Sequence, residues 1–267
     1  MSYLHTLTPA ENLVLRDNSK GRLRDLLKAT MLDLLMKQVL VFHEVVKDPD
    51  KRGRPRIYKY VEAGPRFNEH LQLDLRTHEA PFVVPFNKST GTRYLFKNLV
   101  RIAFHRAVNT RAYHALILSE PRMMPLRSGG LFNWFGIARL NASGKVAREV
   151  LLAEIARAEA ELVPLLNAKD DRARQLLTRL NGNVLLLQGI DLSMLPDLSI
   201  GEMDNPSRPG WSGTGCSGCS SFGGFDSGFD AGADAAGCGG DGGSGCSGSG
   251  CAGSGCGGCG GCGGGCS

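Results

Sequence analysis

Apolar residues recur at helical spacing near the start of the chain. The segment "LTPAENLVL" places Thr8 directly before Pro9, with Glu11 three residues after Thr8. This order is typical of a capping box, in which the threonine and glutamate side chains accept each other's backbone N–H groups and proline pre-sets the first helical φ. In the next segment, 19–38, leucine and methionine return on one helical face. The pattern therefore predicts two consecutive helices.

The period of the pattern changes after residue 38. The segments "VLVFHEVV" (39–46) and "IYKYVEAG" (57–64) are rich in β-branched and aromatic residues, which favours strands. The polar segment between them contains Gly53 and Pro55 and is typical of a turn. Two helices followed by a hairpin are the outline of a winged-helix module, and we predict one over residues 1–66.

A similar pattern follows over residues 67–200. It predicts helices over 92–108 and 110–120, a strand within 131–145 that ends in a helix cap near Ser143, and a long helix that Pro164 kinks or ends. A last helical stretch, 171–190, is interrupted near Gly182. In the first of these helices the residues expected to point inward are Leu95, Leu99, Ile102 and Ala103. We therefore predict a mainly α body with small β-hairpins, whose second winged-helix-like unit is closed by long helices.

Composition separates residues 201–267 from this body. All nine cysteines and 26 of the 36 glycines lie beyond residue 200. Such a stretch cannot bury enough apolar surface to offset the entropy of ordering it, so we predict a disordered Gly/Ser/Cys-rich tail. The exception is "SFGGFDSGFDAGAD", where Phe222, Phe225 and Phe229 alternate with aspartates. This segment is expected to dock in a groove on the body or on a partner.

Charge divides the chain at the same place. Residues 1–200 carry 30 basic and 20 acidic side chains, whereas the rest carries Arg208 against six acids. A basic body favours an acidic protein partner, nucleic acid or an anionic membrane surface. The sequence shows no apolar run long enough for a transmembrane segment and no signal-peptide pattern at its start. We therefore expect a cytoplasmic protein.

Two basic groups are candidate anion- or nucleic-acid-binding residues. The first, Arg52, Arg54 and Arg56, lies in "KRGRPR", which contains the Arg-Gly-Arg-Pro core of an AT-hook. The second, Arg93, Lys97 and Arg101 with His105, recurs every four residues along one helical face and can follow a row of phosphates. The alternatives are a solvated hairpin loop for the first group and the wet side of an amphipathic helix for the second.

The cysteines allow three interpretations. Metal capture of zinc or copper is the first, because C-x-x-C spacing lets two thiolates hold one ion. Its candidate ligands are Cys216, Cys219, Cys256, Cys259, Cys262 and Cys266. The second is modification by an enzyme, since a glycine precedes every cysteine and the Gly/Ser/Cys tract resembles microcin B17-type precursors, whose thiols and hydroxyls form azoles. The third is a flexible thiol-bearing extension without a defined site.

No catalytic pattern is found in the sequence: the histidines lack metal-binding spacing, and no nucleophile elbow or phosphate-binding glycine loop is present. The leading hypothesis is therefore a non-enzymatic binding protein, with no certain cofactor. The alternatives are a metal- or thiol-handling protein, a substrate of a peptide-modifying enzyme, and a DNA-binding protein that uses the basic wing.

The order of these features resembles a family of uncharacterised bacterial proteins that open near "LTPAENLVL", carry a late "LLLQGIDLSMLPDL" segment and end in a Gly/Cys tract. That family implies no activity. The first half also resembles the helix-and-hairpin repeats of Golgi phosphoinositide-binding phosphoproteins. This second resemblance implies recognition of anionic membranes through basic residues.

Overall fold

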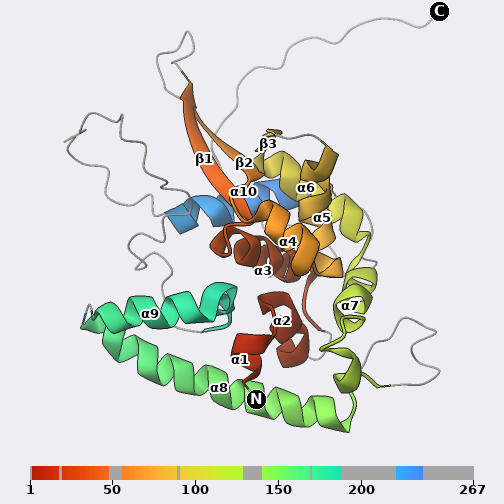
Figure 1. The fold of residues 1–267 in the computed structure, drawn as a ribbon, viewed down its shortest axis with the longest axis vertical. Coiled ribbons are helices and arrows are strands. Elements are labelled where there is room, and N and C mark those ends of the chain that lie inside the picture. The colour runs from red at the N-terminus through yellow and green to blue at the C-terminus, as the bar shows by residue number, and fades with distance from the viewer. Residues whose placement is uncertain are drawn as a thin grey trace, which may run out of the picture.

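A computed structural model describes residues 2–17, 20–47, 56–88, 91–128, 140–168, 170–187 and 221–236. These residues form a mainly helical fold with one small antiparallel sheet, as predicted (Figure 1). The α-helices are α1 (Tyr3–Thr6), α2 (Pro9–Asp17), α3 (Leu23–Met36), α4 (Phe67–Leu73), α5 (Ala80–Val83), α6 (Phe96–Ala107), α7 (Thr110–Leu118), α8 (Ala142–Asn167), α9 (Asp171–Leu180) and α10 (Ser221–Ala236). The strands are β1 (Leu40–Lys47), β2 (Arg56–Ala63) and β3 (Tyr94–Leu95). Short 3-10 helices are η1 (Thr77–Glu79), η2 (Val84–Lys88), η3 (Met124–Leu126) and η5 (Asn181–Leu186).

The capping box at the start of α2 is confirmed. The backbone N–H of Thr8 donates to the Glu11 carboxylate at 2.7 Å, and the N–H of Glu11 donates to the Thr8 hydroxyl at 3.3 Å. Helix α2 begins at Pro9, and α3 follows with its leucine and methionine face buried. The two helices predicted at the N-terminus are therefore present, and they contact each other.

The predicted hairpin is confirmed and gains a third strand. β1 and β2 pair antiparallel from Leu40↔Ala63 to Lys47↔Arg56. β3 then pairs with β2 through Tyr60↔Leu95. Our prediction that the helix includes residues 92–95 was wrong, because Tyr94 and Leu95 complete the sheet and α6 starts one residue later. Leu95 is accordingly half-buried rather than a core residue of that helix.

Helix α3 lies in the middle of the fold (Figure 1). On one side of it lie α2 and α1, and beyond them α8 runs along the edge of the molecule. The sheet and α6 lie on the other side. The apolar core runs continuously across the boundary that we predicted at residue 66, since Phe82, Leu99 and Tyr113 belong to the same cluster as Leu27.

The second half contains the predicted helices with three differences. The cap of α8 is Asn141, whose side chain accepts the N–H of Gly144 at 2.7 Å, rather than Ser143. Pro164 lies inside α8 and does not end it. Apart from β3, the described residues from 67 to 128 and from 140 to 187 hold one isolated bridge, Arg127↔Leu140, and no second hairpin. Of the segment 131–145, in which we predicted a strand, residues 131–139 lie outside the described residues, and Leu140 forms this bridge.

Helix α10 corrects the prediction of disorder for part of residues 201–267. Residues 221–236 are helical, and Phe225 and Phe229 are buried against α6 and its neighbours. Burial of two aromatic side chains supplies the apolar surface that the glycine-rich composition lacks. The docking expected for this segment is therefore seen on the chain's own body.

None of the described helices is both long enough and apolar enough to cross a bilayer.

Gly182 occupies a position where a side chain does not fit. A methyl group there would lie 2.7 Å from the ring of Pro9 and 2.9 Å from the Cα of Asp33. We expect Gly182→Ala to lower the free energy of unfolding by about 1–3 kcal/mol, the usual cost of overpacking. Gly21→Ala is the control, since its methyl group would meet neighbours at 3.8 Å. Urea unfolding followed by circular dichroism measures both, and equal stability of the two variants would contradict the packing argument.

Candidate anion-binding cleft

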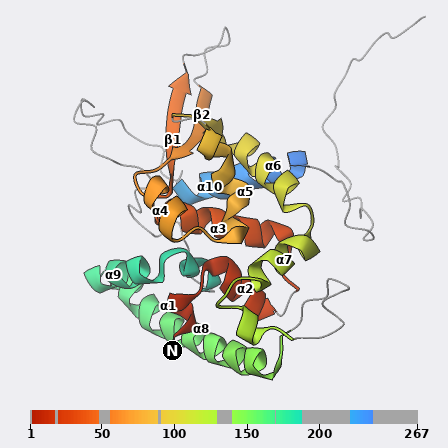
Figure 2. The same cartoon turned by 45° about the vertical axis from the view of Figure 1, so that its right-hand side comes forward.

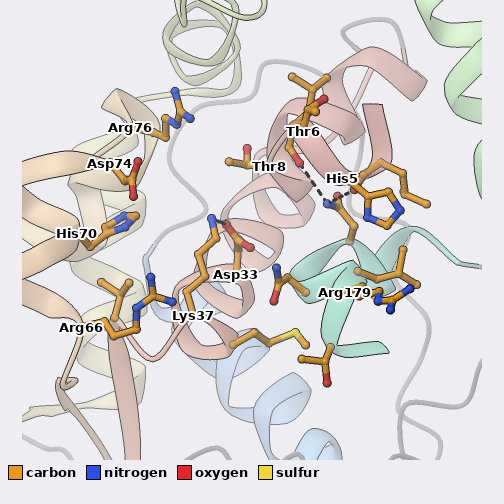
Figure 3. A pocket seen from close by; sticks show the side chains of 18 of the residues that line it. His5, Thr6, Thr8, Asp33, Lys37, Arg66, His70, Asp74, Arg76 and Arg179 are labelled. Carbon is orange, nitrogen blue, oxygen red and sulfur yellow. Dashed lines mark hydrogen bonds and ion pairs between the residues drawn. The ribbon is translucent and has the colours of Figure 1, made fainter. Parts of the chain in front are cut away.

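A cleft of about 510 Å³ opens between the N-terminal segment, α3, α4 and the turn from α9 into η5. Its walls carry charged side chains from both sides. Figure 3 shows Asp33 and Lys37 in the middle, with His5 and Arg179 on one side and, on the other, Arg66, His70, Asp74 and Arg76. Cavities of this volume are typical of sites for small ligands.

Five cationic side chains line the cleft, each from a different segment. They are Lys37, Arg66, Arg76, Arg122 and Arg179. Lys37 follows the last turn of α3, Arg66 directly precedes α4, and Arg76 directly precedes η1. Arg122 lies after α7, and Arg179 lies in the last turn of α9. Ends of helices meet at this place, so residues distant in sequence face one hollow. Three carboxylates, Asp33, Glu69 and Asp74, also line it, leaving an excess of positive charge.

Not all of these cations are available to a ligand. Lys37 donates to Asp33 at 2.5 Å, and Arg122 donates to the backbone carbonyl of Thr6. Arg66 lies 3.5 Å from Glu69, a weak pair because both side chains are more than half exposed. Within the described residues, Arg76 and Arg179 have no carboxylate at ion-pair distance. These two guanidinium groups are the ones most open to an added anion.

A buried polar network lies behind the cleft. His70, in the cleft wall, shares a hydrogen bond of 2.8 Å with Glu79, which also accepts the N–H of Arg76 at 2.8 Å. The neighbouring His78 contacts the Thr8 hydroxyl through one ring nitrogen at 3.3 Å, and its other nitrogen lies 3.6 Å from Glu120. This network connects the wall of the cleft to the start of α2.

The network extends to a buried tyrosine. The Tyr113 hydroxyl donates to the carbonyl of His78 at 2.7 Å and lies 3.0 Å from the Thr30 hydroxyl. Burial raises the pKa of Tyr113, so its hydroxyl stays protonated and can donate. The polar groups behind the cleft are therefore held by α3 and α7 as well as by η1.

The carboxylates of this region have opposite pKa shifts. Burial alone would raise the pKa of Glu79, but the hydrogen bond from His70 and the nearby His78 outweigh it and the pKa is lowered. The pKa of Glu120 is lowered in the same way, where contacts with His78 and the N–H of Thr77 outweigh burial. Burial raises the pKa of Asp33 even though Lys37 opposes the shift. The folded protein therefore stabilises the charged form of Glu79 and Glu120 and disfavours the charged form of Asp33.

The structure describes some of the anion-binding residues that we predicted from the sequence. Arg52 and Arg54 are outside the described residues, and of Arg56 the structure describes the backbone at the start of β2. Arg93 pairs with Glu62 at 2.6 Å on the sheet. Lys97 and Arg101 are exposed along α6, which is compatible with both interpretations of this face.

Of the predicted site residues whose side chains the structure describes, Arg93, Lys97 and Arg101, none lines the cleft. The cysteines proposed as metal ligands, Cys216, Cys219, Cys256, Cys259, Cys262 and Cys266, lie outside the described residues. Among the described side chains, no cluster of three or more metal-binding groups is present.

Sequence reasoning missed the cleft because its cations are single residues spread from Lys37 to Arg179. The available signal was weak: Arg66 and Arg76 stand directly before short helices, and Arg179 stands in a final turn, positions common for surface charges. Comparison with known proteins adds no assignment, since no family model, curated protein or solved structure matches the chain. The resemblances suggested by the sequence stay predictions.

Proposed function

We propose that the body of this protein binds a small anionic ligand, of the phosphate-bearing class, in the cleft between α3, α4 and α9. The observation that carries the proposal is the convergence of five cationic side chains from five segments on one hollow of about 510 Å³. Guanidinium groups suit this role because their planar fork donates two hydrogen bonds to a phosphate. Arg76 and Arg179 lie on opposite sides of the cleft, so both of its walls contribute a guanidinium group without a carboxylate partner among the described residues (Figure 3).

The depth of the site favours a small ligand over a flat macromolecular surface. Asp33 and Thr8 line the cleft and are almost fully buried, so its floor lies inside the fold. His70 adds a ring held in place by Glu79, which fixes its orientation toward the cleft. A preorganised wall of this kind lowers the entropy lost when a ligand binds.

Inorganic pyrophosphate is a suitable probe, and isothermal titration calorimetry on the full chain measures its binding. We expect the double variant Arg76→Ala/Arg179→Ala to weaken binding roughly a hundredfold or more, because each of the two lost hydrogen bonds to a charged group contributes about 1.5–3 kcal/mol. The matched control is Lys97→Ala/Arg101→Ala, which removes two exposed cations from α6. Equal loss in both variants would show unspecific charge attraction and would contradict the proposal.

A second candidate is binding of nucleic acid along the exposed basic face of α6. The exposure of Lys97 and Arg101 along α6 supports it, since such a face can follow phosphates. The same pair of variants separates the two functions. Salt-sensitive retention of duplex DNA should fall in Lys97→Ala/Arg101→Ala and stay unchanged in the cleft variant.

A further inference from the structure

The surface beneath α10 is a groove built from aromatic residues. Phe96 and Phe104 of α6 and Phe42 of β1 form its walls, and Val100 lies between them; we call these four residues the aromatic groove. Phe225 lies with its ring centroid 5.4 Å from that of Phe96. Figure 2 shows α10 beside α6, with α3 on its other side.

Phe229 continues the same row of contacts one helical turn later. Its ring centroid is 6.1 Å from that of Phe104 and 6.4 Å from that of Phe96. Its side chain is fully buried, and that of Phe225 is nearly so. The groove therefore holds two aromatic side chains spaced i, i+4 on one helix face.

Two further contacts fix the register of α10 in the groove. A methyl group on Gly232 would lie 2.8 Å from the Cβ of Val100 and 3.0 Å from the carbonyl oxygen of Lys97, so this position admits only glycine. Asp230 accepts a hydrogen bond from Arg24 of α3 at 2.9 Å, and this contact raises the pKa of Arg24. The groove therefore selects the pattern Phe-x-x-x-Phe-Asp-x-Gly.

The helix depends on the groove for its own structure. Four of its sixteen residues, Gly223, Gly224, Gly228 and Gly232, are glycine, which is among the poorest helix formers. Its largest contact is with α6, and it also touches β1 through Phe42 and α3 through Arg24. A long connection, residues 188–220, joins it to the body in sequence, and long connections add little closure cost.

We propose that the aromatic groove is an exchangeable docking site, and that α10 of a second copy of this chain binds there in place of the resident helix. The second copy is the occupant that the structure supports, since its helix carries the same two phenylalanines, aspartate and glycine. Exchange of an identical element replaces every contact in kind, so the two arrangements differ mainly in the entropy of association.

The first test uses a fluorescently labelled peptide of residues 221–236. The full-chain variant Phe225→Ala/Phe229→Ala empties its own groove and should bind the peptide at least ten times more tightly than the wild-type chain, where the resident helix competes. A peptide with Gly232→Val is the matched control and should bind at least ten times more weakly. Equal binding of both peptides, or no binding to the variant, would overturn the proposal.

The second test needs no peptide, and its first measurement uses the wild-type chain alone, so it covers the case in which the emptied variant does not fold. Hydrogen exchange of the wild-type chain should show α10 amides exchanging at least ten times faster than those of α3, because the helix opens without the body. Mixing the emptied variant with Val100→Trp, which blocks the groove and keeps α10, should give a one-to-one complex by light scattering. Exchange of α10 only at the rate of α3 would show a permanent part of the core and end the proposal.

Discussion

Replacing Glu79 by alanine is expected to destabilise the protein more than any other single change proposed for its polar groups. The change leaves two donors without their buried acceptor, and because each unsatisfied buried donor costs about 1–3 kcal/mol, we expect a loss of roughly 2–6 kcal/mol at this position, where Glu79 is 1% exposed. The change removes the acceptor for His70 and for the N–H of Arg76, both at 2.8 Å. Chemical unfolding at neutral pH measures the loss in free energy of unfolding.

Two further variants serve as controls for the Glu79→Ala measurement. Glu69→Ala removes an exposed glutamate of α4 that lies 3.5 Å from Arg66, and we expect it to cost less than about 1 kcal/mol. Glu79→Gln keeps the volume and one carbonyl acceptor, so it should recover part of the stability lost in the alanine variant. If Glu79→Ala were no less stable than Glu69→Ala, the network behind the cleft would not be a main support of the fold.

Local patterns predicted the elements whose stabilising contacts are close in sequence. The capping box identified the start of α2 because its partners, Thr8 and Glu11, are three residues apart. The hairpin was found for the same reason, since β1 and β2 are neighbours in the chain. β3 was missed because two residues, Tyr94 and Leu95, become a strand only beside β2, which ends some thirty residues earlier.

Helix α10 and the cleft depend on contacts between segments that are distant in the sequence, so local patterns did not predict them. Composition argued against structure in residues 221–236, and α10 exists because Phe225 and Phe229 meet a groove made by β1 and α6. The cleft has the same origin. Arg76 and Arg179 are over a hundred residues apart, and neither belongs to a motif. They line one cleft because η1 and η5, the element that follows α9, both pack against α3.

Stability is expected to fall steeply in acid because of Glu79 and Glu120. Their pKa values in the folded protein are lowered from the usual 4.5, so the unfolded chain binds their protons more readily. Their contribution is fully present above pH 4.5 and is lost as the pH falls through the lowered folded values. Thermal unfolding measured between pH 7 and pH 3 should therefore show a declining midpoint over the acidic part of that range.

Asp33 has the opposite effect on the pH dependence of stability, so it serves as an internal control for the two glutamates. Its pKa is raised in the folded protein, so protonation on acidification relieves a buried charge and partly offsets the loss from the glutamates. Asp33→Asn removes this offset and should make the decline in acid steeper, whereas Glu120→Gln should make it shallower. Thr77 and His78 lose the charge of their partner in Glu120→Gln, so its stability at neutral pH should fall. Identical pH profiles for the two variants would show that neither carboxylate controls unfolding in acid.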